Sequence, residues 1–498
     1  MEAWQISHYR MPHLVPFSAH LAEDGQTVVL AADASEYEIN FTGVDGGRVL
    51  DSVLAMANPG AEIWFDIHQG SAQPWQLSLA RQLDELSLIR DAPADHSALE
   101  RRRLELEALA QRCVERLLEA TAAHRSLYAP VTLIMLNLLD EPPPQADAFA
   151  VDGIGEPEWS DNFALQTFYL QKLYLADNMP QMIGLWRRVL NGFADASGLA
   201  GRRVARLPQA DRPDSMGFYC PAHIEAYLLC LVDLLLLAPL PQARRRLSGR
   251  LAVTDPDSGV NFMRRAEQFA LESLSQLGES RYVQRVNADG ASFSPLVQGL
   301  FVEQYHVTQR FVEIIAPLMT KRLRTPLKQR VYRYFQEELG HEAFERATCE
   351  ALGVPSSWLD QALPLPLFQA YVDAFTVLGR YDPIGYLSSI MVTEGMPGMD
   401  NPVHQRLESL VEDRADYQRV AKRHDDLNLE LNHAALSRLF FREISVLSPQ
   451  TQRWALGNLA YLLELNLRAM DQVADFYGAQ TRLTMCSLDS YVALHDRD

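Results

Sequence analysis

Glutamate and histidine recur at one spacing in the C-terminal part of this chain. The pattern Glu-x-x-His occurs three times, as Glu303 with His306, Glu338 with His341, and Glu430 with His433. Residues three apart lie on the same face of an α-helix, so each pair can present a carboxylate and an imidazole to one ion. Oxygen and nitrogen ligands of this kind suit iron or manganese. The spacing therefore predicts a metal site assembled from helices.

The order of these residues fits a site for two metal ions in a helical bundle. Such a site takes one glutamate from each of two helices and a Glu-x-x-His pair from each of two others. In chain order, the candidate ligands are Glu303, Glu338, His341, Glu394, Asp426, Glu430 and His433. His306 exceeds what the site needs, so we expect it to support the ligands or to pack in the core. Arg310 lies among many acids, and we expect it to form a structural ion pair.

The apolar surroundings of the candidates favour buried ligands over a solvated acidic face. The stretch "QEELGHEAFERA" has helical spacing and predicts one amphipathic helix that carries Glu338 and His341. Glu394 ends the apolar stretch "YLSSIMVTE", where a lone carboxylate would be costly unless it were paired or coordinated. Aromatic side chains that could line a substrate pocket, or simply belong to the core, are Tyr305, Phe335, Phe344 and Tyr386.

Composition limits the class of protein. With 498 residues the chain is long enough for two or three domains, and its net charge of -19 argues against general binding to nucleic acid. Five scattered cysteines without a Cys-x-x-Cys pair favour a reducing, cytoplasmic setting. No secretory signal starts the chain. The most apolar run, "AYLLCLVDLLLLAPLP", contains Asp233 and ends in prolines before it could span a membrane, so it predicts a buried helix.

Changes in sequence pattern predict a mainly α protein in three parts. Residues 1–96 contain the β-rich runs "QTVVLAA" and "SEYEINF" and then helical spacing in "GGRVLDSVLAMA" and "PWQLSLARQLDELSLIRD", which predicts a small α+β domain. Residues 97–287 predict a helical middle region. Residues 288–498 predict a helical bundle, with helix starts at Ser294-Pro295 and Thr325-Pro326.

Three stretches of the last part resemble the heme-oxygenase-like di-iron oxidases, which are relatives of the TenA and PqqC fold. They are "EELGHEAFERATCEALGVPSSWLDQALPLP", "DPIGYLSSIMVTEGMP" and "HDDLNLELNHAALSRLF", and the resemblance covers residues 296–478. It implies a heme-oxygenase-like bundle that binds two ferrous ions and uses dioxygen as co-substrate. It further implies that Glu338, His341, Glu430 and His433 are terminal ligands. Glu394 would bridge the ions, and Glu303 or Asp426 would complete the second one.

The N-terminal part resembles, in pattern and length, the winged-helix-like peptide-binding modules related to PqqD. The leading hypothesis is a non-heme iron-dependent oxidase or oxygenase of specialised metabolism that acts on an amino acid, an amine or a peptide-borne side chain. Alternatives are a metal-free enzyme of the TenA and PqqC type and a helical interaction protein. Because the three-residue spacing is also that of ferritin-like di-iron N-oxygenases, the same ligands admit that fold too. A homodimer and an external electron donor stay open as partners, with no role for nucleic acid or membrane.

Overall fold

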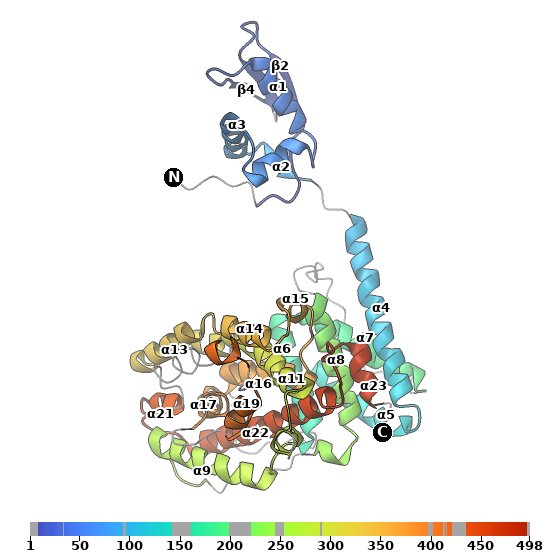
Figure 1. Cartoon of the computed structure of the whole chain (residues 1–498), viewed down its shortest axis with the longest axis vertical. Coiled ribbons are helices and arrows are strands. Elements are labelled where there is room, and N and C mark those ends of the chain that lie inside the picture. The colour runs from blue at the N-terminus through green and yellow to red at the C-terminus, as the bar shows by residue number, and fades with distance from the viewer. Residues whose placement is uncertain are drawn as a thin grey trace. The chain divides into compact units, whose positions relative to one another are not determined.

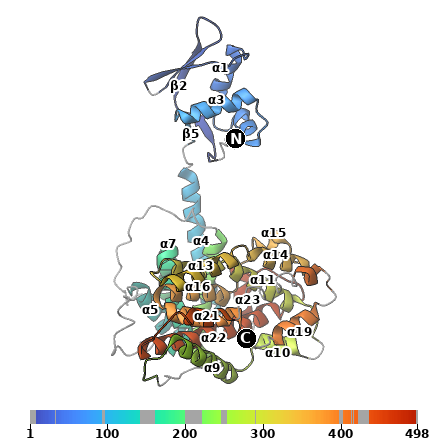
Figure 2. The same cartoon turned by 90° about the vertical axis from the view of Figure 1, so that its left-hand side faces the viewer.

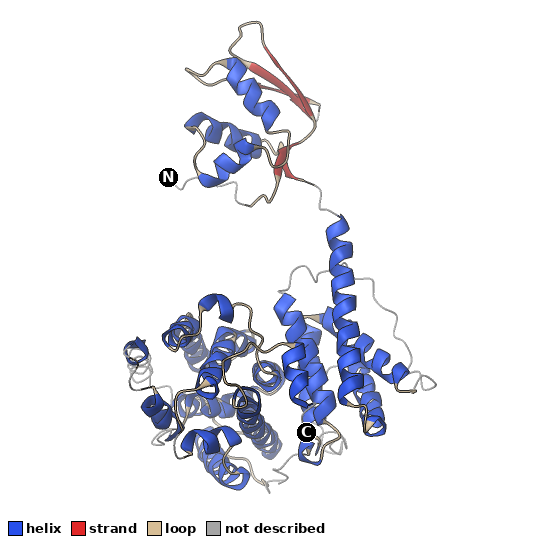
Figure 3. Ribbon diagram, turned by 45° about the vertical axis from the view of Figure 1, so that its right-hand side comes forward, coloured by secondary structure: helices blue, strands red, loops and turns tan. Residues whose placement is uncertain are grey.

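The computed structural model describes residues 8–32, 34–92, 96–141, 161–198, 221–244, 253–288, 291–396, 402–411, 414, 416–420 and 435–495. The chain separates into two compact units, residues 1–104 and 105–498 (Figure 1). The described strands all lie in the first unit, and the second unit is built from helices (Figure 3). The predicted mainly α class is therefore confirmed, and so is a small α+β region at the N-terminus.

The first unit combines two small antiparallel sheets with three helices. One sheet pairs β1 with β5, and the other has the order β2-β3-β4. The strands are β1 (Pro12–Leu14), β2 (Phe17–Leu21), β3 (Val28–Ala32), β4 (Ser35–Ile39) and β5 (Ile89–Asp91), and the helices are α1 (Gly46–Ala55), α2 (Glu62–Gln69) and α3 (Pro74–Glu85). Alternate residues of β3, namely Val28, Leu30 and Ala32, are buried, and α1 packs against β2 and β3. This period of two is that of a strand with one covered face.

The sequence pattern predicted some of these elements and missed others. The two predicted strands are β3 and β4, and the two helical runs contain α1 and α3. The end of the second run forms β5 instead of helix, which corrects that prediction. β2 was missed because only one side of "FSAHL" is partly covered, and α2 was missed because its eight residues give a short periodic signal.

The second unit begins within its first helix and contains one continuous core. Its helices are α4 (His96–Ala120), α5 (Arg125–Asp140), α6 (Phe163–Asn178), α7 (Pro180–Ala196), α8 (Pro221–Leu237), α9 (Gly259–Leu277), α10 (Arg281–Asn287), α11 (Pro295–Gln309), α12 (Phe311–Met319), α13 (Thr325–Glu338), α14 (Glu342–Ala351), α15 (Ser356–Leu359), α16 (Pro366–Tyr381), α17 (Pro383–Ser389), α18 (Met391–Glu394), α19 (Pro402–Leu410), α21 (Leu436–Phe441), α22 (Pro449–Tyr477) and α23 (Leu488–His495), with a 3₁₀ turn at η3 (Pro241–Ala243). Figure 2 shows this unit from a second direction, with α9 along one side.

Helix α16 organises that core. Nearly all of its side chains are buried, and it packs against α6, α8, α12 and α22. Residues of the predicted middle region, such as Trp186 and Leu228, share one hydrophobic cluster with Phe375 and Leu462 of the predicted bundle. The structure therefore draws no division at residues 287 and 288, because the apolar faces of both parts cover one another.

The apolar run in the middle of the sequence forms α8, a buried helix as predicted. The acidic residue within its apolar run, Asp233, accepts hydrogen bonds from the Tyr491 hydroxyl at 2.7 Å and from Gln472 Nε2 at 3.1 Å. These partners offset the cost of burying a carboxylate in an apolar helix. Within the described residues, no helix is long and apolar enough to cross a membrane.

Candidate metal centre

The stretch around Glu338 and His341 is two helices and not the single helix that its spacing predicted. Helix α13 ends at Glu338, and α14 begins at Glu342. Between them, Leu339 is extended and Gly340 has a φ of 87°, a left-handed conformation that glycine adopts without a steric penalty. Leu339 is 55% exposed at this break.

Glu338 and His341 nevertheless meet across the break. His341 Nδ1 lies 2.9 Å from Glu338 Oε2, and each residue is only 5% exposed. In metal sites, a histidine ligand commonly donates one ring N–H to a carboxylate and binds the ion through its other nitrogen. The pair therefore has the arrangement of a supported imidazole ligand, which the three-residue spacing alone did not reveal.

Glu394 joins this pair through a tyrosine. The Tyr334 hydroxyl, four residues before Glu338 on α13, donates a 2.8 Å hydrogen bond to Glu394 Oε1 at the end of α18. Burial raises the pKa of Tyr334 well above its ordinary value, and the charges of Glu394 and Glu338 raise it further. Both carboxylates thus lie close to one hydroxyl, so the structure brings together Glu338, His341 and Glu394.

A further carboxylate, Glu345, belongs to the same region and was not singled out in the sequence. Burial raises its pKa to about 7, and the neighbouring His341 acts in the opposite direction. Its signal was present in the sequence, since Glu345 follows His341 by four residues and both lie at the start of α14. We call Glu338, His341, Glu345 and Glu394, with Tyr334, the candidate metal centre.

Glu303, on α11, has a different set of hydrogen-bond partners. Its Oε2 accepts a 2.8 Å hydrogen bond from the backbone N–H of Leu365, at the start of α16, and its Oε1 accepts one of 2.9 Å from the Tyr477 hydroxyl. Burial raises the pKa of Glu303 to about 8. Among its described contacts none reaches Glu338, His341 or Glu394, so the structure assigns Glu303 a helix-capping contact.

The first Glu-x-x-His pair does not form a second supported imidazole. His306 is buried, and burial lowers its pKa to about 3, so the ring is neutral at physiological pH. The remaining candidates, Asp426, Glu430 and His433, lie outside the described residues.

Does the described donor set fit iron? Buried carboxylate oxygens and an imidazole nitrogen are ligands that ferrous iron accepts. The described part of the chain contains no group of three or more histidine, cysteine or acidic side chains arranged to hold an ion. The described side chains therefore do not make a metal site by themselves, and three of the predicted ligands, Asp426, Glu430 and His433, are not among the described residues.

A second cluster of buried polar side chains in this unit is built around an arginine, Arg310. Arg310 Nη2 donates to Asp373 Oδ1 and to Glu313 Oε2, each at 2.8 Å. The other members, which hydrogen bond to one of these carboxylates, are Tyr174, Gln171 and Tyr227. This Arg310 cluster joins α6 and α8 to α11, α12 and α16, and it confirms the predicted structural ion pair of Arg310.

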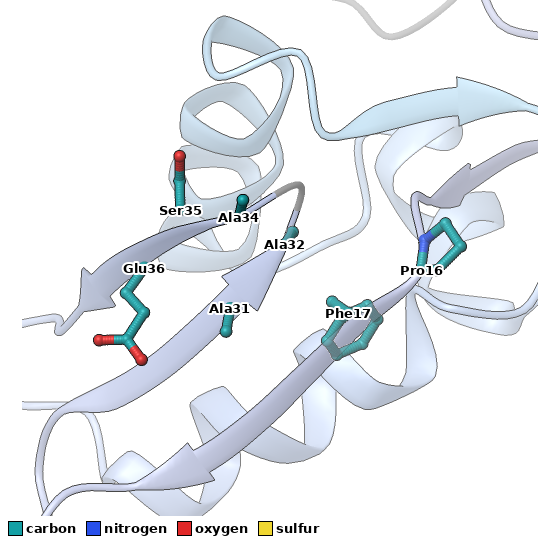
Figure 4. A pocket seen from close by; sticks show the side chains of 7 residues that line it. All are labelled: Pro16, Phe17, Ala31, Ala32, Ala34, Ser35 and Glu36. Carbon is teal, nitrogen blue, oxygen red and sulfur yellow. The ribbon is translucent and has the colours of Figure 1, made fainter.

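The first unit contains an open pocket of about 810 Å³ on its three-stranded sheet (Figure 4). It is lined by Pro16, Phe17, Ala31, Ala32, Ala34, Ser35 and Glu36. Ala34, in the turn between β3 and β4, has a φ of 65°. Small side chains leave the backbone of β3 and β4 accessible here, with one ring and one carboxylate at the margins.

Comparison with known proteins adds little to this site. No family model and no curated protein matches the chain. A matching solved structure is a domain of unknown function with a heme oxygenase-like fold from Shewanella denitrificans OS217. The two chains are 18% identical, the match covers 45% of this chain and 97% of that one, and the TM-score is 0.38. At this level we conclude nothing from the likeness, and the heme-oxygenase-like bundle stays a prediction.

Proposed function

We propose that the chain is a non-heme iron-dependent oxidase or oxygenase whose substrate is an amino acid, an amine or a peptide-borne side chain. The observation that carries the proposal is the buried Glu338–His341 pair, held beside Glu394 by Tyr334. A carboxylate in a nearly dry interior is costly unless it is paired or coordinated. Cation binding would offset that cost for a group of several acids and one imidazole.

In this proposal each side chain of the candidate metal centre has a role in the reaction. When bound, ferrous iron supplies the reduction of dioxygen. Glu338 fixes the ring of His341 through Nδ1, and the Tyr334 hydroxyl fixes one oxygen of Glu394. Glu345, with a pKa raised to about 7 by burial, can hold or release a proton near neutral pH.

A metal-free acid–base enzyme is the second candidate function. The specific observation in its favour is Glu345, because a carboxyl with a pKa near the working pH is suited to general acid–base catalysis. In that case the Glu338–His341 pair would orient the substrate or share a proton with it. This candidate predicts activity that neither ferrous iron nor a chelator changes.

Dioxygen uptake separates the two candidates. Full-length protein is loaded with ferrous iron without oxygen, mixed with oxygenated buffer, and followed with an oxygen electrode. We expect rapid uptake by the wild-type protein and a loss of it in Glu338→Ala and His341→Ala. Uptake that equals that of free ferrous iron, or that survives both substitutions, would sink the iron-dependent proposal.

A peptide-borne substrate is supported by the pocket of the first unit. β4 is the last strand of its sheet, so its outer edge offers backbone groups that an extended peptide could pair with. A random peptide library displayed on phage can be selected against the full chain. We expect enriched peptides that no longer bind Ala31→Trp, which fills the pocket. Enriched peptides that bind both proteins equally would contradict this role.

A further inference from the structure

The hydroxyl of Tyr386 on α17 is buried without a hydrogen-bond partner among the described residues. The same holds for the Ser389 hydroxyl, one helical turn later. Leaving a buried hydroxyl unsatisfied costs free energy, and native interiors contain few such groups. Two of them one turn apart on a single helix therefore offer hydrogen bonds to a polar group from outside the described residues.

The backbone places Tyr386 beside the candidate metal centre. Ile390 N–H donates to the Tyr386 carbonyl at 3.2 Å, and Glu394 N–H donates to the Ile390 carbonyl at 2.9 Å. Helical bonding thus continues from α17 into α18, so Tyr386 and Glu394 lie two turns apart on neighbouring faces. The charges of Glu394 and Glu338 act on the Tyr386 hydroxyl, although burial contributes more to its raised pKa.

Packing on α16 holds the tyrosine ring in place. The rings of Tyr386 and Phe375 meet edge to face with centroids 5.9 Å apart, and Phe375 meets Tyr371 at 5.0 Å. A ring fixed in this way presents its hydroxyl at one position, which is what a positioning group requires.

Tyr282 on α10 is an internal comparison. It is also fully buried, and its hydroxyl also has no partner among the described residues. Burial is the cause of its raised pKa, with no contribution from an acidic neighbour. An unsatisfied tyrosine hydroxyl is thus not by itself a site, and Tyr386 differs because the charges of Glu394 and Glu338 act on its hydroxyl.

We propose that the Tyr386 hydroxyl positions an amine group of the substrate at the candidate metal centre. An ammonium group has three N–H donors, and the tyrosine oxygen and a carboxylate are acceptors for them. The carboxylates of Glu394 and Glu338 act electrostatically on this hydroxyl, so a cationic ligand is favoured over an anionic one. The inference rests on the proposed function for the identity of the site, and it narrows the substrate class to amines.

Fluorine NMR tests this positioning role directly. 3-Fluorotyrosine is placed at position 386 of the metal-free full chain and, in a separate sample, at position 282. Each is titrated with butylamine, butyrate and butanol as probes. We expect butylamine to shift the 386 resonance in a saturable way while butyrate does not, and the 282 resonance to stay constant. A 386 resonance that ignores butylamine, or that responds equally to butyrate, overturns the proposal.

Two conservative variants separate positioning from structure and from metal binding. Tyr386→Phe and Ser389→Ala remove hydroxyls that have no partner in the described structure, so we expect both proteins to fold and to bind ferrous iron as the wild type does. We expect Tyr386→Phe to weaken butylamine binding about tenfold, the effect of losing a hydrogen bond to a charged group. Unchanged butylamine affinity would refute the role of Tyr386. Failure of the wild type to bind iron would instead refute the proposed function.

Discussion

The candidate metal centre and the Arg310 cluster both contain buried polar side chains of the same helical unit. They differ in the basic side chain that contacts the carboxylates, which is His341 in the first and Arg310 in the second. In the Arg310 cluster, one guanidinium binds two carboxylates, and tyrosine and glutamine side chains donate further hydrogen bonds to them. In the candidate metal centre, Glu338, Glu345 and Glu394 accompany a single histidine, His341. A guanidinium keeps its charge and so stabilises an arrangement of helices by itself, whereas an imidazole beside carboxylates can also serve as a ligand for a cation.

The largest expected effect on stability comes from a substitution in the Arg310 cluster. Asp373 is fully buried, and its removal leaves Arg310 with one carboxylate fewer in the interior. We expect Asp373→Ala to lower the free energy of unfolding by about 3–5 kcal/mol, measured by urea denaturation of the metal-free protein. Asp373→Asn, which keeps the hydrogen-bonding shape, should cost less. A loss below about 1 kcal/mol for the alanine variant would show that this ion pair contributes little to stability.

Glu303 is a fully buried carboxyl group that belongs neither to the candidate metal centre nor to the Arg310 cluster. Its pKa is raised from 4.5 to about 8, so the folded state holds the proton more tightly than the unfolded state does. Its contribution to stability is therefore fully present below about pH 4.5 and is lost as the pH rises towards 8. The slope is at most about 1.4 kcal/mol per pH unit.

Glu303→Gln should flatten that part of the stability curve between pH 5 and 8 in thermal melts of the metal-free protein. Glu345→Gln is the matched variant, and its effect should end near pH 7, where the pKa of Glu345 lies. If the curve of either variant keeps the wild-type slope between pH 6.5 and its upper limit, the direction assigned to that group is wrong; below pH 6.5 the lowered pKa of buried His306 adds a slope of opposite sign.

The break between α13 and α14 at Gly340 allows a test in which a smaller change in stability is expected. Gly340 and Gly353 flank α14, and their φ angles are 87° and 85°, with open space around both Cβ positions. Each glycine-to-alanine substitution should cost about 1 kcal/mol through backbone strain alone. Only Gly340→Ala should also weaken ferrous iron binding, because Gly340 sets the approach of Glu338 to His341. Equal iron affinity in both variants would show that the break does not shape the site.

The smallest expected effect on stability comes from a substitution in the candidate metal centre. Glu338→Gln keeps the side-chain shape and leaves an amide that can still hydrogen bond to His341. We expect the free energy of unfolding of the metal-free protein to fall by no more than about 1 kcal/mol, measured by urea denaturation. A loss as large as that of Asp373→Ala would identify Glu338 as part of a structural network.

The pairing of Glu338 with His341 could be predicted from the sequence, but its geometry could not. The three-residue spacing indicated a shared helical face, whereas the two side chains meet because Gly340 reverses the chain between them. Glycine within a helical pattern is often tolerated, so its left-handed conformation carried no local signal.

Contacts between distant parts of the chain were beyond the reach of pattern analysis. Arg310 and Asp373 are separated by 63 positions, and Tyr334 and Glu394 by 60, so only tertiary packing brings each pair together. For the same reason, the described residues between 97 and 287 are mainly helical as predicted, while their common core with the C-terminal helices was not apparent. Helix-start patterns were more informative: Ser294 precedes α11 as predicted, and α13 begins at Thr325.

Ferrous iron stoichiometry tests the central claim most directly. Equilibrium dialysis without oxygen compares the wild type with His341→Ala and with His306→Ala, which removes the other buried histidine of a Glu-x-x-His pair. We predict about two irons per chain for the wild type and for His306→Ala, the content of a carboxylate-bridged bundle site, and about one or fewer for His341→Ala. No iron in the wild type, or equal iron in all three proteins, would contradict a metal centre at Glu338 and His341.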